Sequence, residues 1–313
     1  MTPPTAVVHL VRAVNGMAPF ERFMTSYERY DAGAEHELVL LLKGFDQPSS
    51  SGPYLERAAA WAPRTLEILD TGSDVTAYRA AAHRLSHRRI CFLNSFSEIA
   101  APAWLDRLET ALSRSGVGAA GATGSWGSHL SYNMFQAGWG GRYARAFPSR
   151  PHARRAMHAL SDTQPRGEVP ERLYAARQAL RDVRTMPQFP SAHLRTNAFL
   201  VDRERFAGLR FVGAGDKRAA YRFESGRRGL TAQLRAAGRR GVIVDRLGDV
   251  HDEQAWDRAD VFWQSRQDRL LVHDNQTRAY AAAPADVRAV LSAFAWGQRA
   301  SPASGEGGER PSR

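Results

Sequence analysis

The chain has 313 residues, of which 43% are hydrophobic, so it is long enough to bury the core of one large domain or two small ones. Its 43 Lys and Arg residues outnumber its 32 Asp and Glu residues, and the resulting net charge of +11 is compatible with nucleic acid, anionic lipid or phosphorylated ligands without selecting among them. A single cysteine, Cys91, excludes an intramolecular disulfide and a Cys-rich zinc site and favours a reducing compartment.

Four short apolar segments in the first hundred residues are predicted to be strands. They span residues 6–11, 37–42, 65–69 and 89–93. Continuous apolar character is typical of parallel strands that are covered on both faces, so Cys91 in the fourth segment is expected to be a buried, inert thiol. Residues 19–30 and 75–85 repeat apolar side chains at helical spacing. This alternation predicts an open α/β sheet with right-handed crossovers.

The next part of the chain continues this pattern and then departs from it. Pro102 marks the start of an amphipathic helix that ends near Gly116, and a fifth strand is predicted at residues 117–122. From about residue 125 to 190 aromatic residues, glycines and arginines are mixed, and a helix is predicted over residues 170–184. We interpret residues 125–190 as an insertion over the sheet and not as a separate domain.

Sheet character returns in the last third of the chain. Strands are predicted at residues 193–201 and 242–244, with a helix over residues 229–237 between them. The segment 301–313 is rich in Ser, Gly, Pro and Arg and is predicted to be a disordered tail. We therefore expect a single domain over residues 1–300.

The sequence contains no segment of about 18 consecutive apolar residues, and its first residues lack a basic flank followed by an apolar stretch. We therefore expect a cytoplasmic protein. Peripheral association with the inner face of a membrane stays open, because a basic surface attracts anionic lipid.

Polar residues follow each of the first four predicted strands. They are Asn15, Asp46, Asp74, Asn94 and Ser95. Ligands of open parallel sheets bind beyond the carboxyl ends of the strands, where helix N-termini also point, so these residues are candidates for binding a nucleotide sugar. Ordinary turn and helix-cap chemistry favours the same residue types, and both interpretations stay open.

The chain resembles the inverting glycosyltransferases of family two, which have the GT-A fold. The resemblance covers roughly residues 6–252 and is carried by RICFLNSFSEIAAPAWLDRL, which starts at Arg89, and by the later segments GVGAAGATGSW, HLRTNAFLVDRERFAGLRF and FESGRRGLTAQLRAAGRRGVIVD. It implies a fold of the nucleotide-diphospho-sugar transferase type, with an open, mainly parallel sheet and helices on both faces.

The metal-binding Asp-x-Asp motif of that family is altered in this chain. Its positions fall within Asn94-Ser95-Phe96-Ser97-Glu98, where Glu98 is the one carboxylate. The resemblance implies a divalent cation, Mn²⁺ or Mg²⁺, but hard cations prefer charged oxygen ligands. Glu98 and His251 are the candidate ligands, with a structural histidine as the alternative for His251. If no metal binds, Arg79 is a candidate to stabilise the departing diphosphate.

The resemblance also assigns roles on the acceptor side. Glu224 resembles the acidic residue that activates the acceptor hydroxyl at the start of a helix, and a structural ion pair with a neighbouring arginine is the alternative. Asn197 falls where the family makes acceptor contacts. Trp126 and Trp139 either stack on a sugar ring or pack in the core.

Three functions follow from these observations. The first is a hexosyltransferase-type enzyme of polysaccharide biosynthesis that transfers a sugar, with inversion, from a nucleoside diphosphate sugar to a saccharide or cell-envelope acceptor. The alternative is a non-catalytic relative that binds nucleotide or acts as a scaffold. A nucleic-acid-binding protein is the third, but the chain has no helix-turn-helix, zinc-finger or RNA-binding fingerprint, so no specific nucleic acid is expected.

Overall fold

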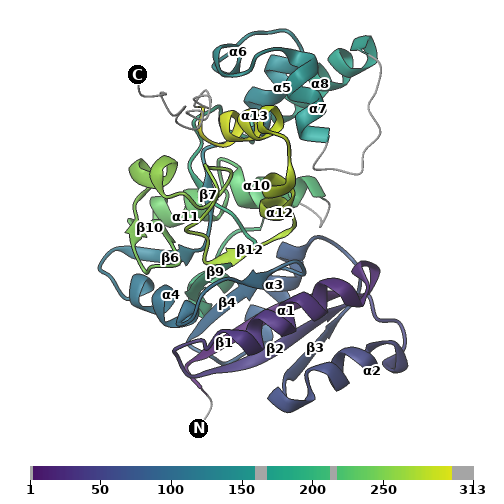
Figure 1. Ribbon diagram of the computed structural model, residues 1–313, viewed down its shortest axis with the longest axis vertical. Coiled ribbons are helices and arrows are strands. Elements are labelled where there is room, and N and C mark those ends of the chain that lie inside the picture. The colour runs from purple at the N-terminus through teal and green to yellow at the C-terminus, as the bar shows by residue number, and fades with distance from the viewer. Residues whose placement is uncertain (1–2, 159–167, 212–216, 298–313) are drawn as a thin grey trace, which may run out of the picture.

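The computed structural model describes residues 3–158, 168–211 and 217–297, so the tail predicted at residues 301–313 lies outside the described residues. Within these ranges eight strands form one open sheet in the order β11-β10-β6-β9-β4-β1-β2-β3 (Figure 1). Their bounds are β1 (Thr5–Arg12), β2 (His36–Lys43), β3 (Arg64–Ile68), β4 (Arg89–Leu93), β6 (Val117–Gly121), β9 (Ala198–Asp202), β10 (Arg240–Val244) and β11 (Val250–His251).

The strand directions confirm an open, mainly parallel sheet. β1 is parallel to β2 and β4, β2 to β3, and β6 to β10. β9 lies antiparallel between β4 and β6, and β11 is antiparallel to β10. Two further ladders are short: β5 (Glu98–Ile99) pairs with β12 (Val272–His273), and β7 (Gly124–Ser125) pairs with β8 (His193–Leu194).

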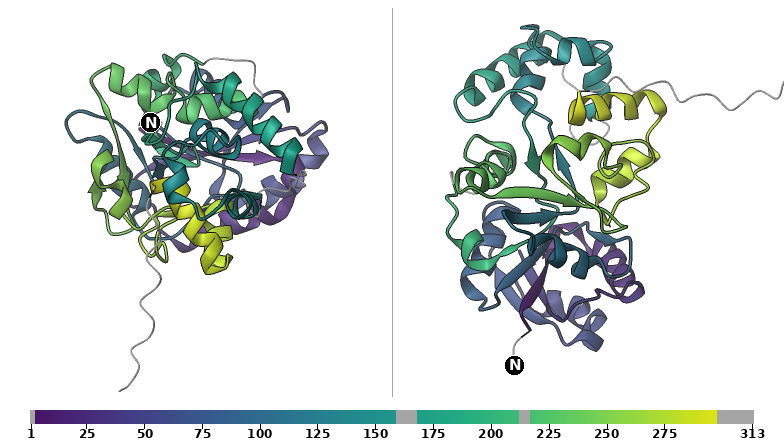
Figure 2. Two further views of the ribbon diagram at one scale, coloured as in Figure 1. Left: turned by 90° about the horizontal axis from the view of Figure 1, so that it is seen from above. Right: turned by 90° about the vertical axis from the view of Figure 1, so that its left-hand side faces the viewer.

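Helices cover both faces of the sheet, as predicted (Figure 2). Alternate side chains of β1 point to opposite faces, with Val7 and Val11 in one core and Val8 and Leu10 in the other. The first core is closed by α1 (Met17–Arg29), α2 (Pro48–Arg57) and α4 (Trp104–Leu112). The second is closed by α3 (Asp74–Arg84), α9 (Arg203–Ala207), α10 (Lys217–Ser225) and α11 (Leu230–Ala236). Cys91 is fully buried in the first core, and burial raises the pKa of its thiol.

Two strand predictions are wrong in detail. β3 ends at Ile68, and Leu69 is 78% exposed, because β3 is the edge of the sheet and is not covered on both faces. Residues 193–201, expected to form one strand, are split into β8 and β9. The backbone leaves the ladder between them, where the Arg195 amide donates to the Thr123 carbonyl and the Thr196 amide donates to the Glu224 carboxylate.

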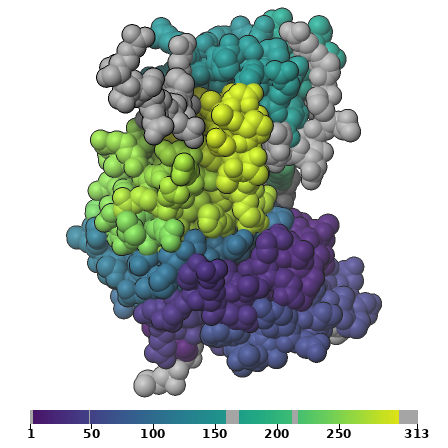
Figure 3. Space-filling model, viewed as in Figure 1, coloured from purple at the N-terminus to yellow at the C-terminus, as the bar shows by residue number. Residues whose placement is uncertain are grey.

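The segment between β7 and β8 gathers at the end of the molecule away from the N-terminus (Figure 2). Its helices are α5 (His129–Gln136), α6 (Tyr143–Ala146), α7 (Arg150–His158) and α8 (Glu168–Asp182). α13 (Ala285–Trp296), which follows α12 (Asn275–Ala282), packs against α6 and α7. In the space-filling view the yellow C-terminal part lies directly below this teal segment (Figure 3).

Three short 3-10 helices complete the described elements: η1 (Ala13–Asn15), η2 (Ala59–Trp61) and η3 (Glu253–Arg258). Across the described residues, none of the helices combines the length and apolar character that a membrane crossing requires.

Candidate functional site

A cleft of about 520 Å³ opens at the carboxyl edge of the sheet, beyond β1 and β4. Four of the predicted residues line it: Asp74, Asn94, Asn197 and Glu224. Asn94 and Asn197 meet because β9 runs antiparallel to β4, so the start of one strand lies beside the end of the other. The Asn94 amide donates to the Asn197 carbonyl at 2.8 Å. The pairing of the strands therefore brings together residues that are 103 positions apart in the sequence.

The residues after β4 form a tight turn. The side-chain oxygen of Asn94, Oδ1, accepts hydrogen bonds from the Phe96 amide at 3.0 Å and from Ser97 Oγ at 3.1 Å. Asn94 therefore stabilises the turn that carries it, in the manner of other Asx turns. Ser95 is 5% exposed, and its hydroxyl has no hydrogen-bond partner among the described residues.

Glu224 is held by one of its two carboxylate oxygens. Oε2 accepts hydrogen bonds from the backbone amide of Thr196 at 2.7 Å and from its hydroxyl at 2.6 Å. Within the described part of the chain Oε1 accepts no hydrogen bond, and no ion pair joins Glu224 to a neighbouring arginine. The expectation that Glu224 opens a helix is wrong, because it lies in the last turn of α10, before the turn that leads to α11.

Asn197 combines a fixed oxygen with an unused donor. Its Oδ1 accepts a hydrogen bond from Thr123 Oγ1 at 2.6 Å, and this bond orients the amide. Its Nδ2 is buried and has no partner among the described residues. Buried donors are rarely left unpaired, so this amide is available to a ligand oxygen in the cleft.

Three cationic side chains line the same cleft. Arg195 is 7% exposed and pairs with the fully buried Asp274 at 2.8 Å, so its charge is already compensated. Arg12 lies at the end of β1 and forms ion pairs with Asp70, 3.4 Å from its Nη2, and with Asp74, 4.0 Å from its Nε. Lys217 begins α10 and forms no ion pair with the described residues; it lies 6.0 Å from the ring centre of Tyr221. Lys217 is therefore the cation most open to an anionic ligand, whereas Arg12 shares its charge with two partly exposed carboxylates.

Lys43 positions the loop that borders the cleft, and sequence reasoning missed it. Its side chain is fully buried, and its ammonium group donates to the Gly72 carbonyl at 2.6 Å and lies 3.5 Å from Asp70. The sequence does single out Lys43, because it is one of only two lysines in the chain and stands at the end of an apolar strand. Arg12, Thr196 and Lys217 were also missed, because the sequence offers arginines and threonines at many strand and helix ends.

Several predicted residues lie outside the cleft lining. Asn15 ends η1, and Asp46 is exposed in the loop after β2. Arg79 lies on α3 with its guanidinium 4.9 Å from the ring centre of Phe211, at a distance typical of a cation–π contact. Ser95 is buried beneath the turn that follows β4. Trp126 donates from its indole to the Glu253 carbonyl and packs on Trp296, which favours the core interpretation for this residue.

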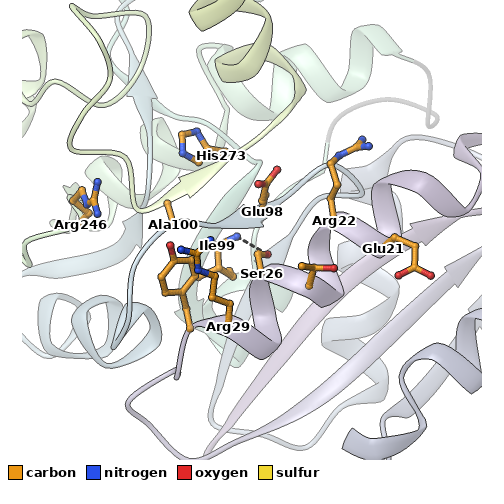
Figure 4. Close-up of a pocket in the computed structure, with 11 residues that line it drawn as sticks. Glu21, Arg22, Ser26, Arg29, Glu98, Ile99, Ala100, Arg246 and His273 are labelled. Atoms are coloured by element: carbon orange, nitrogen blue, oxygen red, sulfur yellow. Dashed lines mark hydrogen bonds between the residues drawn. The ribbon is translucent and has the colours of Figure 1, made fainter.

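The two candidate metal ligands have other partners. Glu98 lines a separate hollow of about 440 Å³, where it lies between Arg22 and His273 (Figure 4) and pairs with Arg278 at 3.1 Å. His251 Nε2 lies 2.9 Å from Asp245 Oδ2.

The residues at the altered motif do not fit a divalent cation. Asn94 already uses its oxygen in the turn, Phe96 supplies no ligand, and the charge of Glu98 is compensated by Arg278. Over residues 3–158, 168–211 and 217–297 no group of three or more His, Cys, Asp and Glu side chains could hold a metal ion.

No protein-family model matches the chain, and no curated protein matches its sequence. Among solved structures it is similar to a mannosyltransferase from Pyrobaculum calidifontis in complex with GDP-Man and Mn²⁺, with 15% identity over 94% of this chain and 69% of that one and a TM-score of 0.40. It is also similar to glucosyl-3-phosphoglycerate synthase from Mycobacterium tuberculosis, with 15% identity over 64% and 57% of the two chains and a TM-score of 0.33.

Residues 1–349 of S. aureus TarS share 11% identity with this chain, over 38% of it and 34% of the TarS fragment, at a TM-score of 0.31. The chain thus spans about a third of the TarS fragment and 57% of the synthase. The predicted resemblance to glycosyltransferases is matched among solved structures. A functional assignment rests on the residues of the cleft.

Proposed function

We propose that the protein transfers a sugar from a nucleoside diphosphate sugar to a hydroxyl group of a saccharide or cell-envelope acceptor, with inversion at the anomeric carbon. The observation that carries this proposal is Glu224, whose Oε2 is fixed by Thr196 while its Oε1 stays open beside the cleft. A fixed carboxylate with a free oxygen at the carboxyl edge of a parallel sheet suits a general base.

In the proposed reaction Glu224 Oε1 accepts the proton of the acceptor hydroxyl. The acceptor oxygen forms a bond to the anomeric carbon on the face opposite the leaving group. The bond between that carbon and the donor phosphate oxygen breaks, and its electron pair stays on the nucleoside diphosphate. Asn197 Nδ2 is a candidate donor to an acceptor oxygen, because it lines the cleft without a protein partner among the described residues.

The departing diphosphate gains negative charge, and the proposed counter-charges are Lys217 and Arg12. Both line the cleft, and Lys217 has no carboxylate partner in the described ranges. Fixed cations lower the energy of a transition state that develops negative charge. Since the residues at Asn94 to Glu98 do not fit a divalent cation, these side chains take the place that Arg79 held in the sequence-based hypothesis.

The proposal is tested by measuring nucleoside diphosphate release from a panel of donor sugars and oligosaccharide acceptors. Removal of a general base slows catalysis by about 10²- to 10⁴-fold, so Glu224→Gln should lower kcat at least about 100-fold and leave the nucleotide Kd unchanged. Glu204→Gln is the matched control, because the Glu204 side chain is 87% exposed and its ion-pair partner among the described residues is its neighbour Arg203. Full transfer by the Glu224→Gln variant would contradict the assignment.

A non-catalytic relative is the second candidate function. It is favoured by one observation, the segment Asn94-Ser95-Phe96-Ser97-Glu98, where Asn, Ser or Phe replaces the carboxylates of the resembled family and Asn94 Oδ1 is used within the turn. Such a protein would bind nucleoside diphosphate in the cleft and release none from any donor. The same panel therefore separates the two candidates. A cytoplasmic location, a role in polysaccharide biosynthesis and a single domain with an insertion stay predictions.

A further inference from the structure

A second pocket lies on the opposite side of α10 from the cleft. Its volume is about 400 Å³, and seven residues line it, of which Thr185 and Phe223 are the two without charge. The other five are arginines: Arg184, Arg210, Arg222, Arg227 and Arg228. We refer to this site as the arginine pocket. α10 separates it from the cleft, because Tyr221 and Glu224 line the cleft whereas Arg222 and Phe223 line the arginine pocket.

The backbone around the arginine pocket is held by specific hydrogen bonds. The Arg227 amide donates to the Thr185 carbonyl at 2.9 Å, which ties the turn before α11 to the end of α8. The side-chain amide of Gln233 donates to the carbonyls of Arg210 and Arg228 at 2.9 and 2.8 Å, and its oxygen accepts from the Arg210 amide at 2.8 Å. Three separate segments are thereby fixed around one space.

The turn between α10 and α11 is also close-packed. A Cβ atom at Gly226 would lie 2.3 Å from the Arg222 carbonyl oxygen, and one at Gly229 would lie 2.6 Å from the Phe223 oxygen. Only glycine fits such close approaches, so the turn that presents Arg227 and Arg228 has little freedom to rearrange. The backbone that presents Arg227 and Arg228 is therefore fixed before any ligand arrives, while their side chains, like those of Arg184 and Arg210, are exposed.

The charges in the arginine pocket are not compensated by the described residues. No carboxylate lines it, and none of its five guanidinium groups forms an ion pair in the described ranges. Arg218, one turn before Arg222 on α10, shows the usual arrangement, since it pairs with Asp182 at 2.7 Å. The Nε of Arg222 is buried without a hydrogen-bond partner. Five like charges around one space repel one another unless an anion lies between them.

The chemistry of the lining defines the anion. Guanidinium groups bind phosphate oxygens through paired hydrogen bonds, and several of them together suit a ligand with several phosphate charges. Phe223 forms an apolar wall that stacks on Phe211, with ring centres 4.5 Å apart and an interplanar angle of 7°. The volume is within the range of small-molecule sites. We propose that the arginine pocket binds a small ligand that carries two or more phosphate groups, separately from the cleft.

Inorganic tripolyphosphate is the probe for this proposal. Its affinity for the full-length protein is measured by isothermal titration calorimetry at constant ionic strength, because salt screens such contacts. We expect the Arg222→Gln/Arg227→Gln double variant to lose at least about tenfold in affinity, since each guanidinium–phosphate contact is a charged hydrogen bond. The Arg184→Gln/Arg228→Gln double variant should show the same loss of affinity for tripolyphosphate. It replaces the first double variant in the test if that one does not fold.

Two controls separate this site from net charge and from the cleft. Arg114→Gln/Arg258→Gln removes the same charge at exposed positions outside the arginine pocket and should bind tripolyphosphate as the unmodified protein does. Arg12→Gln weakens any binding of tripolyphosphate in the cleft and should leave the affinity of the arginine pocket unchanged, so the two sites are fitted separately. An equal loss in the charge-matched control, complete loss of binding with Arg12→Gln, or unchanged affinity in both arginine-pocket variants would overturn the proposal. So would binding of duplex nucleic acid or anionic vesicles without binding of tripolyphosphate. None of these outcomes depends on transferase activity.

Discussion

His9 is a fully buried histidine in the central strand β1. Its ring stacks on Phe23 with centres 3.6 Å apart, and both ring nitrogens are buried without a partner among the described residues. Burial disfavours the charged imidazolium and lowers the pKa of His9 to about 3. In the unfolded chain the ordinary pKa is about 6.5. The His9 side chain is therefore protonated below about pH 6.5 in the unfolded state, whereas in the folded state it stays neutral down to about pH 3.

This difference predicts a loss of stability in acid. Because the unfolded state binds more protons in that window, the free energy of unfolding falls as the pH is lowered through it, by about 1.4 kcal/mol per pH unit from His9 alone. Between about pH 7 and about pH 5 the unmodified protein should lose about 2 kcal/mol more than His9→Phe. Urea unfolding at the two pH values measures this, with the exposed His83→Phe as control.

The other histidines do not disturb the comparison. Burial also lowers the pKa of four more histidines, namely His87, His129, His193 and His273, and these are present in every variant. Equal acid sensitivity of the His9→Phe variant and the unmodified protein would show that His9 is accessible to protons in the folded state.

Residue types alone predicted part of the cleft. Asp74 and Asn94 line it because polar residues that follow the strands face the carboxyl edge of the sheet, whereas Asn197 was predicted from the family resemblance. Asp46 obeys the same rule and lies exposed after β2, while the neighbouring Lys43 turns inward to the Gly72 carbonyl. Whether Asp46 or Lys43 turns toward the cleft depends on which of the two side chains the loop buries. Tertiary packing decides this, and the local sequence does not show it.

At the scale of elements, α12 depends on its N-cap. Asp274 is fully buried, its Oδ1 accepts a hydrogen bond from the Thr277 amide at 2.8 Å, and the Thr277 hydroxyl accepts in return from the Asp274 amide. The same carboxylate pairs with Arg195 through Oδ2. One side chain thus stabilises a helix start and compensates a buried charge in the cleft.

Asp274→Ala removes both interactions, and removal of one partner of a buried ion pair costs about 3 to 5 kcal/mol. Asp274→Asn keeps an oxygen for the cap and loses only the charge, so we expect it to be more stable than the alanine variant by about 1 kcal/mol. Urea unfolding gives both values. Asp46→Ala, at an exposed position, should stay within about 0.5 kcal/mol of the unmodified protein. Equal stability of the alanine and asparagine variants would rule out the cap.

Apolar segments and helical spacing predicted most of the central elements, but not their directions. The apolar sequence of β9 predicts a strand but not its direction. Its antiparallel pairing with β4 and β6 depends on the path of the long segment that precedes it in the chain. Between residues 252 and 301 the sequence pattern predicts no element, although the structure has β12, α12 and α13 there. β12 has only two residues, which is too short for an alternating pattern. The apolar side chains of α13 contact both α6 and α7, so its sequence shows no single apolar face at helical spacing.

At the scale of the whole molecule, the cleft predicts nucleotide binding that is independent of metal. A nucleoside diphosphate should raise the melting temperature, because a ligand of the folded state stabilises it by mass action. We expect the same rise with EDTA as with Mn²⁺, since Lys217 and Arg12 supply the positive charge. Lys217→Gln should reduce the rise under both conditions. A rise that needs Mn²⁺ would mean that carboxylates of this chain assemble a metal site when nucleotide binds.

The ladder between β7 and β8 has a consequence for how the chain could change. The whole segment from Trp126 to Ala192 leaves and rejoins the sheet through this two-residue pairing, Gly124 with Leu194 and Ser125 with His193. α13 covers this segment but comes from residues 285–296, so a chimaera that replaces the segment must take α13 from the same donor chain, while β4, β9 and β6 keep their register. Because none of the described residues between 126 and 192 lines the cleft, such a chimaera should keep the lining of the cleft unchanged.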